Sequence, residues 1–231
     1  MKIKMNSKVT RITCLLLFTA FSCKKENTFT DFRYADKPAA IVCEGTNAKL
    51  LNEALYSFED DIVNHYKKGN SSYRLDQAYS QVIRNAVFGR LKIKDVVSKH
   101  TVSVFEALKN ENDLWDANNP NSFLNYNSAI VSCISKNIQD KALKDTFDAL
   151  LSTNSMSPKL FGAPLVSKYR SLNKDKNLAL YVALDLYYAK MFNVDFSKVN
   201  FEKPEPKVDF NQTPAKPQNL PDANAHAGHN H

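Results

Sequence analysis

Three of the five histidines of this sequence, the side chains best suited to binding a transition metal, lie within its last six residues. The ending AHAGHNH carries His226, His229 and His231. Imidazole binds copper, nickel and zinc, and the intervening Gly228 lets the backbone fold back so that all three rings can reach one ion. This spacing predicts a copper or zinc site in the tail. The alternative is a solvated low-complexity end without a ligand.

A second candidate metal site combines Asp61, His65 and His100. Asp61 stands one helical turn before His65, so its carboxylate could orient the imidazole or join it at a metal. His100 falls on the apolar side of a later predicted helix, and packing of the two helices would bring the three side chains together. Three protein ligands are the minimum for a catalytic zinc. The alternative is that each histidine lies at the edge of the core with one hydrogen bond.

Asp185 is an acidic residue within the otherwise apolar run LALYVALDLYYAKMF, residues 178–192. A carboxylate inside a helix that is apolar all round is costly unless it is paired. The sequence therefore predicts one of two roles for Asp185. Either a lysine, arginine or tyrosine from a neighbouring helix binds it, or it is a ligand-binding acid in a cleft of the bundle.

Several motifs that identify enzymes are missing from the sequence. The five glycines are scattered, so the chain has no phosphate-binding loop and no dinucleotide-binding turn. It also lacks G-x-S-x-G, H-E-x-x-H, and any glutamate three residues before a histidine, the helical di-iron spacing. These absences favour a binding or structural module over an enzyme.

The N-terminal sequence has the three parts of an export signal. An apolar run of ten residues, Ile12 to Phe21, is followed by Ser22 and Cys23. As a helix the run would be about 15 Å long, against roughly 30 Å of bilayer hydrocarbon, so it is too short to span a membrane. The run is preceded by four basic residues and no acid: Lys2, Lys4, Lys8 and Arg11.

The sequence Ala20-Phe21-Ser22 followed by Cys23 resembles the lipobox of bacterial lipoproteins, in which the cysteine is lipidated and becomes the mature N-terminus. Ala20 stands where that family usually has an aliphatic residue. The resemblance implies a membrane anchor of three acyl chains, and more than one chain is what stable anchoring needs. Lys24 is not the aspartate that retains enterobacterial lipoproteins in the inner membrane, which implies the outer membrane. The alternative is an ordinary cleaved signal with an incidental cysteine.

The residues after Cys23 do not decide whether the protein faces the periplasm or the cell surface. Lys24-Lys25-Glu26 is similar to the charged surface-export signal of Bacteroidota lipoproteins, but that signal usually has two acids, and only Glu26 is present. We expect a protein partner in the envelope and no nucleic acid, because the net charge of +7 falls to +3 without the signal. The basic stretch RLKIKDVVSK, residues 90–99, is either a solvated helix start or a weak contact with anionic lipid.

Two cysteines remain in the mature chain once Cys14 leaves with the signal and Cys23 carries lipid. Cys43 and Cys133 would then lie in a compartment where disulfides persist. A bond between them requires their Cα atoms to lie within about 7 Å. The sequence allows this single pairing and leaves two buried thiols as the alternative.

The apolar residues recur with a helical period through most of the chain. No stretch alternates polar and apolar residues for long enough to predict a sheet. The fold class is therefore predicted to be all-α, an irregular bundle of six or seven helices. The predicted helices cover residues 46–68, from Leu75 to Ala86, from Ile93 to Leu108, from a cap at Ser122 to Ile138, and from Ala142 to Leu151. After breaks at Pro158, Gly162 and Pro164 follow a short helix over 165–172 and a buried one over 177–193.

Composition divides the chain into a signal peptide over residues 1–22, a lipidated tether over 23–40, a helical domain over 41–198, and a proline-rich, histidine-ended tail over 199–231 that we expect to be disordered. The sequence predicts a lipid-anchored interaction or structural module of the cell envelope. One alternative is a lipoprotein that handles a transition metal through its tail. The other is a ligand-binding or enzymatic domain with a cleft near Asp185.

Overall fold

The computed structural model describes residues 29–201 of the chain, and its regular secondary structure in this range is helical. By its contacts the chain divides into units of residues 1–199 and 200–231, and the helices within residues 29–201 belong to the first. The predicted all-α fold class is confirmed. The elements are α2 (Ala48–Lys67), α3 (Leu75–Val87), α4 (Ile93–Val96), α5 (Lys99–Leu108), α6 (Ala129–Asn137), α7 (Lys141–Ser152), α8 (Pro158–Lys168), η1 (Tyr169–Asn173), α9 (Lys176–Tyr181), the π-helix η2 (Val182–Tyr188), α10 (Ala189–Met191) and η3 (Phe196–Lys198).

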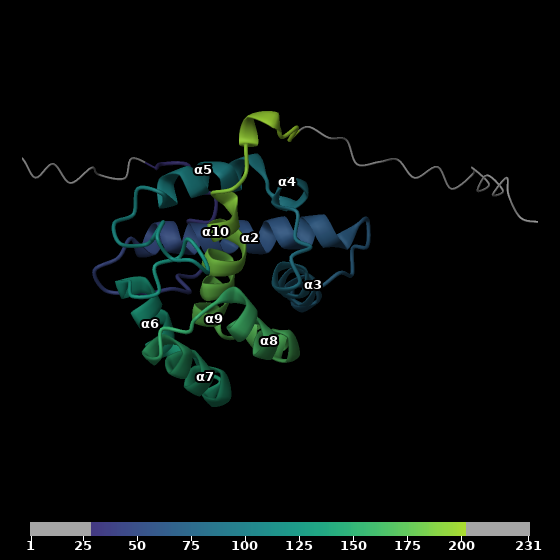
Figure 1. Ribbon diagram of the computed structural model, residues 1–231. Coiled ribbons are helices and arrows are strands. Elements are labelled where there is room, and N and C mark those ends of the chain that lie inside the picture. Colours follow the sequence, from purple (N-terminus) through teal and green to yellow (C-terminus); the bar gives the residue numbers. More distant parts are fainter. Residues whose placement is uncertain (1–28, 202–231) are drawn as a thin grey trace, which may run out of the picture. The chain divides into compact units, whose positions relative to one another are not determined.

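The long helix α2 supplies the central surface on which the other helices pack. Its 20 residues correspond to about 30 Å of helix, and α5 lies along one side of it while α9 and α10 cross it (Figure 1). The apolar face predicted from the sequence is buried, including Leu51, Leu55, Phe58 and Ile62. None of the helices within residues 29–201 combines the length and the apolar character needed to cross a bilayer.

The run from Leu178 to Ala189 is buried on every side, as its all-round apolar composition predicts. It begins as α9, widens into the π-helix η2, and ends as α10. Apolar periodicity does not distinguish a π-helix from an α-helix when every position is buried, so η2 was not predicted. Single π-helical turns inside α-helices are frequent at functional sites, and Asp185 lies in the middle of η2.

The helix predicted from Ile93 to Leu108 is divided into α4 and α5. Val97 takes an extended conformation, with φ −69° and ψ 135°. Ser98 then caps α5, because its hydroxyl accepts a hydrogen bond from the backbone N–H of Thr101. The apolar spacing continues across this break, which explains why periodicity alone predicted one helix.

The predicted cap at Ser122 is also wrong, because α6 starts seven residues later, after the cap Ser128. Residues 116–127 instead form a loop in which asparagine side chains bind nearby backbone groups. One such turn is closed by Asn119, whose side-chain oxygen accepts a hydrogen bond of 3.0 Å from the N–H of Asn121. These local hydrogen bonds compete with the helix that the apolar spacing alone would favour.

Pro158, Gly162 and Pro164 were predicted to break the chain, but all three lie within α8. Pro158 occupies the first helical position, where its missing N–H costs nothing and its fixed φ suits a helix. A Cβ atom added to Gly162 would lie 2.3 Å from Val87 Cγ2. The absence of a side chain at Gly162 therefore permits the close packing of α8 on α3.

Candidate functional site

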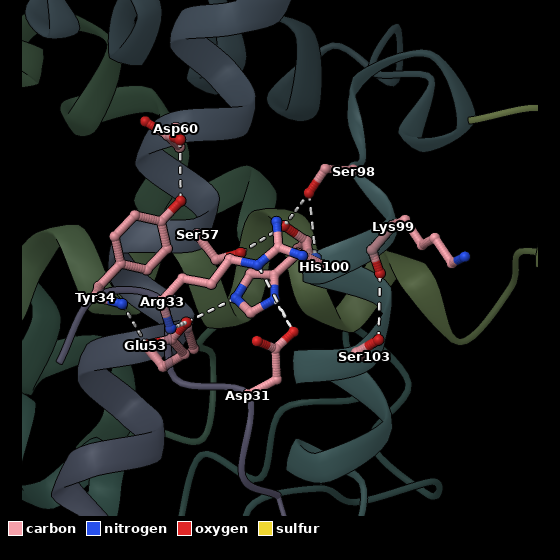
Figure 2. Close-up of polar contacts among 12 residues, drawn as sticks. Asp31, Arg33, Tyr34, Glu53, Ser57, Asp60, Ser98, Lys99, His100 and Ser103 are labelled. Carbon is pink, nitrogen blue, oxygen red and sulfur yellow. Dashed lines mark hydrogen bonds and ion pairs between the residues drawn. The ribbon is translucent and has the colours of Figure 1, made fainter. Parts of the chain in front are cut away.

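A cluster of charged side chains, buried except for Asp31, joins three segments of the fold (Figure 2). Glu53 comes from α2, His100 from α5, and Asp31 from the segment that precedes α2. His100 Nε2 lies 2.6 Å from Glu53 Oε1, and His100 Nδ1 lies 3.2 Å from Asp31 Oδ2. The side chains of His100 and Glu53 are each only 2% exposed. Both ring nitrogens of His100 thus lie within hydrogen-bond distance of a carboxylate oxygen.

Glu53 also binds the backbone of the segment that precedes α2. Its Oε1 accepts a hydrogen bond of 2.8 Å from the N–H of Arg33, and its Oε2 accepts one of 3.1 Å from the N–H of Tyr34. Farther along, Asn52 Oδ1 accepts hydrogen bonds from the N–H groups of Ala40 and Ile41. Residues 29–40, which the sequence analysis assigned to the tether, therefore lie against the helical domain from Phe29 onward.

A network of hydroxyl groups lies between α2 and α5, next to the His100 cluster. The Ser57 and Thr101 hydroxyls are 2.6 Å apart. Asp61 Oδ2 accepts hydrogen bonds from the N–H of Ser98, at 3.1 Å, and from the hydroxyl of Tyr187, at 2.8 Å. Burial raises the pKa of Asp61, and the hydrogen bonds from its hydroxyl and backbone neighbours act in the opposite direction. These contacts hold the two helices together.

The structure does not bring Asp61, His65 and His100 together at one point, so the predicted metal site is wrong. His65 Nδ1 contacts the carbonyl oxygen of Asp95, 3.0 Å away, while His100 faces the two carboxylates described above. Across residues 29–201, no group of three histidine, cysteine or acidic residues could hold a metal ion. The error arises because Glu53, two helical turns before Asp61, is the α2 acid that meets His100.

Two other predicted sites lie outside the described residues. These are the tail histidines His226, His229 and His231, with their expected copper or zinc ion, and the lipidated Cys23. Both stay predictions.

Cys43 and Cys133 form a disulfide that joins the chain just before α2 to helix α6. Their Cα atoms lie 6.0 Å apart, and 90 positions separate them in the sequence. Cys43 is buried, while Cys133 packs at the edge of the core. The bond therefore connects the N-terminal segment to a helix far along the chain.

Asp185 is bound by tyrosines, the paired alternative that the sequence left open. The hydroxyl of Tyr181 donates a hydrogen bond of 2.6 Å to Oδ2, and the hydroxyl of Tyr126 lies 3.1 Å from Oδ1. Burial raises the pKa of Asp185, while hydrogen bonds from Ser122, Tyr181 and Tyr126 act in the opposite direction. The carboxylate thereby ties the π-helix η2 to the asparagine-rich loop.

Asp185 also lines a surface hollow of about 210 Å³ between this loop and η2, together with Phe123, Lys190 and Asn193. Pockets that bind drug-sized ligands usually have volumes of about 300–1,000 Å³. Asp185 itself is 1% exposed, and its carboxylate already accepts tyrosine donors. The geometry therefore favours a structural role for this residue over the ligand-binding role.

The spacing of residues did not predict the Glu53–His100 contact. Glu53 lies beside the apolar face of α2, and its partner is 47 positions away in the chain. A weak signal was present nonetheless, because the residues around Glu53 on α2 (Leu50, Leu51, Ala54 and Leu55) are all apolar and buried. An acid among them needs a buried partner.

The raised pKa of Asp185 predicts how its contribution to stability changes with pH. Because its folded-state pKa is raised, this contribution is complete below the unfolded-state pKa and is lost as pH rises through the folded-state pKa. Relative to Asp185→Asn, the native protein should therefore become less stable as pH rises from about 4, near the ordinary pKa of an aspartate. Urea unfolding of both proteins across this range measures the difference.

Asp140→Asn is the matched control for this pH dependence. The hydrogen bond from the N–H of Leu143 and the neighbouring Lys168 lower the pKa of Asp140. Its stabilising contribution is therefore present above the unfolded-state pKa and is lost as pH falls through the folded-state pKa. The two differences should change with pH in opposite directions, and a pH-independent difference for Asp185→Asn would contradict the assignment.

Comparisons of the chain with protein-family models, with curated proteins and with solved structures found no match. The function is accordingly argued from the geometry of the site itself.

Proposed function

We propose that this protein is an outer-membrane lipoprotein whose helical domain is an interaction module held close to the membrane surface. The observation that carries the proposal is that Phe29 already packs against the core of the domain. Phe29 stands six residues after Cys23, and six residues span at most about 20 Å. A domain that starts this close to an acyl anchor stays next to the bilayer, where it can engage envelope proteins.

The interior of the domain supports an interaction module rather than an enzyme. Every buried side-chain nitrogen or oxygen in the described part of the chain has a hydrogen-bond partner. Buried polar groups left unpaired in a pocket are a common sign of a ligand or substrate site. Here the buried charged side chains are paired with groups of the fold itself, as shown by His100, Glu53, Asp61 and Asp185. The surface is therefore the part of the domain that could recognise a partner.

Two exposed apolar side chains, one at the end of α3 and one in α8, are where we propose that a partner binds. Phe88, directly after α3, is 62% exposed, and Leu160 in α8 is 53% exposed. Helices α3 and α8 pack against each other, with Val87 touching Gly162. Exposed apolar groups on adjoining elements are typical of protein–protein contacts when they form one patch.

The test combines the anchor with this face in cells of the source organism. The native protein should incorporate an alkyne fatty acid and fractionate with the membrane, and Cys23→Ser should abolish both. With a photo-crosslinking amino acid at position 88, the native anchor should give a discrete protein adduct, and the same label at the exposed position 145 of α7 should not.

Each half of the proposal can fail separately. Fatty-acid labelling that persists in Cys23→Ser would contradict lipidation at Cys23. Equal adducts from positions 88 and 145, or none from either, would contradict the interaction face.

A further inference from the structure

An apolar hollow at the N-terminal end of the fold is the largest of the cavities described here, with a volume of about 370 Å³. It lies between residues 32–42 and the start of α2, and Ala39, Val42 and Ala48 are among its lining residues. Val42 is 75% exposed, the most exposed large apolar side chain of the described chain. An exposed apolar side chain at the mouth of an apolar hollow could contact the apolar part of a ligand.

Two lysines line the same hollow, and aromatic rings hold their ammonium groups. Lys37 Nζ lies 4.6 Å from the ring centre of Tyr34 and 4.7 Å from that of Tyr56. Lys49 Nζ lies 3.9 Å from the ring centre of Phe32. Cation–π contacts of this length position a charge without neutralising it. Neither lysine forms an ion pair with a carboxylate in the described part of the chain.

Glu53 is the one acid that lines this hollow, and it does not cancel the charge of the lysines at the surface. Its carboxylate is buried and accepts hydrogen bonds from His100 and from the backbone of Arg33 and Tyr34 (Figure 2). The hollow thus offers two positioned ammonium groups beside an apolar wall. A glycerophospholipid is complementary to this surface, because its phosphate could contact the ammonium groups while its acyl chains contact the apolar wall.

The length of chain before the fold brings this hollow to a lipid surface. Phe32, its first lining residue, stands nine residues after Cys23, at most about 30 Å of extended chain. An anchor of this length keeps lipids at a high effective concentration around the domain, so a site of low intrinsic affinity would be occupied. We propose that the hollow binds an anionic glycerophospholipid, with Lys37 and Lys49 on the phosphate and Val42 against the acyl region. This inference rests on the proposed lipid anchor for its setting.

The first experiment uses the mature chain carrying Cys23→Ser, so it does not depend on acylation. Dihexanoyl-phosphatidylglycerol, kept below its micelle concentration, is titrated while amide NMR shifts are recorded. Saturable shifts are expected in residues 32–42 and at the start of α2. Lys37→Glu/Lys49→Glu should weaken binding by about tenfold or more, because each basic group near anionic lipid contributes on the order of 1 kcal/mol. Val42→Asp, at an exposed apolar position, should weaken it as well.

The matched control is Lys159→Glu/Lys174→Glu, which makes the same charge change at exposed lysines on other elements and should bind like the native chain. Equal weakening in this control would overturn the site. Inorganic phosphate that gives the same shifts would show a free-anion site instead. Equal binding of dihexanoyl-phosphatidylcholine would show that the lysines do not select anionic lipid. Both results would overturn the proposal.

A second experiment places the site in its membrane setting. The acylated protein is reconstituted in phosphatidylcholine vesicles that contain phosphatidylglycerol with a diazirine in its acyl chain. Photolabel is expected on peptides from residues 32–53 and should be lost in Lys37→Glu/Lys49→Glu. Label spread evenly over the domain would contradict the proposal. If mass spectrometry finds no acyl group on Cys23, the proposed anchor fails, while the titration still decides the lipid site.

Discussion

Replacing both Cys43 and Cys133 with alanine is expected to lower the free energy of unfolding by about 4 to 5 kcal/mol. The two cysteines are 90 positions apart, and in the chain-entropy model a cross-link across so long a loop strongly restricts the unfolded chain. Alanine adds no bulk at either site, so the folded packing is little changed. Denaturation in guanidinium, monitored by helical circular dichroism, measures the loss.

Reduction supplies the control for the double variant. Dithiothreitol should destabilise the native protein by a similar amount and should leave Cys43→Ala/Cys133→Ala unchanged. A native protein whose unfolding midpoint is unaffected by the reductant, although both thiols then react with iodoacetamide, would contradict the predicted contribution.

Glu53→Ala is expected to lower the free energy of unfolding by about 3 to 5 kcal/mol. The substitution leaves the buried imidazole of His100 without its closest acceptor, which was 2.6 Å away. It also removes the acceptor for the N–H groups of Arg33 and Tyr34. Urea unfolding measures the loss, and hydrogen exchange should show increased opening of residues 31–34.

A double-mutant cycle with His100→Ala separates this contact from the loss of packing. Because the two side chains bind each other, the effect of the double substitution should be clearly smaller than the sum of the single ones. Asp145→Ala, which breaks the surface pair with Lys141, is the control and should change stability little. Additive effects of Glu53→Ala and His100→Ala would contradict the assigned coupling.

The helices that follow from one-sided apolar periodicity could be predicted from the sequence. Leu51, Leu55, Phe58 and Ile62 recur at helical spacing, and one face of α2 is buried as expected. Local hydrogen bonding determined the helix boundaries that apolar periodicity did not predict. The capping side chain of Ser98 starts a new helix, α5, within one apolar run. Asparagine turns replace the predicted start of the next helix, although the apolar spacing is unbroken.

The candidate site was less predictable because its contacts join distant segments. The sequence left His100 as either a metal ligand or a histidine at the edge of the core, and nothing in its spacing pairs this residue with Glu53 or Asp31. Asp185 was identified from composition alone, since one acid in an apolar run needs a partner. Which partner it took depended on the fold of the loop that carries Tyr126.

If the proposed lipid anchor holds the domain by its N-terminal end, the disulfide has a mechanical consequence. A pull on the anchor would load the contact between Asp31 and His100, and then the hydrogen bonds between Glu53 and the Arg33–Tyr34 backbone. If these yield, the segment before α2 separates from the fold only as far as Cys43, which is covalently joined to α6. The chain from Phe29 to Cys43 would extend to about 50 Å. The force would then reach the core through the disulfide rather than through the ends of its helices.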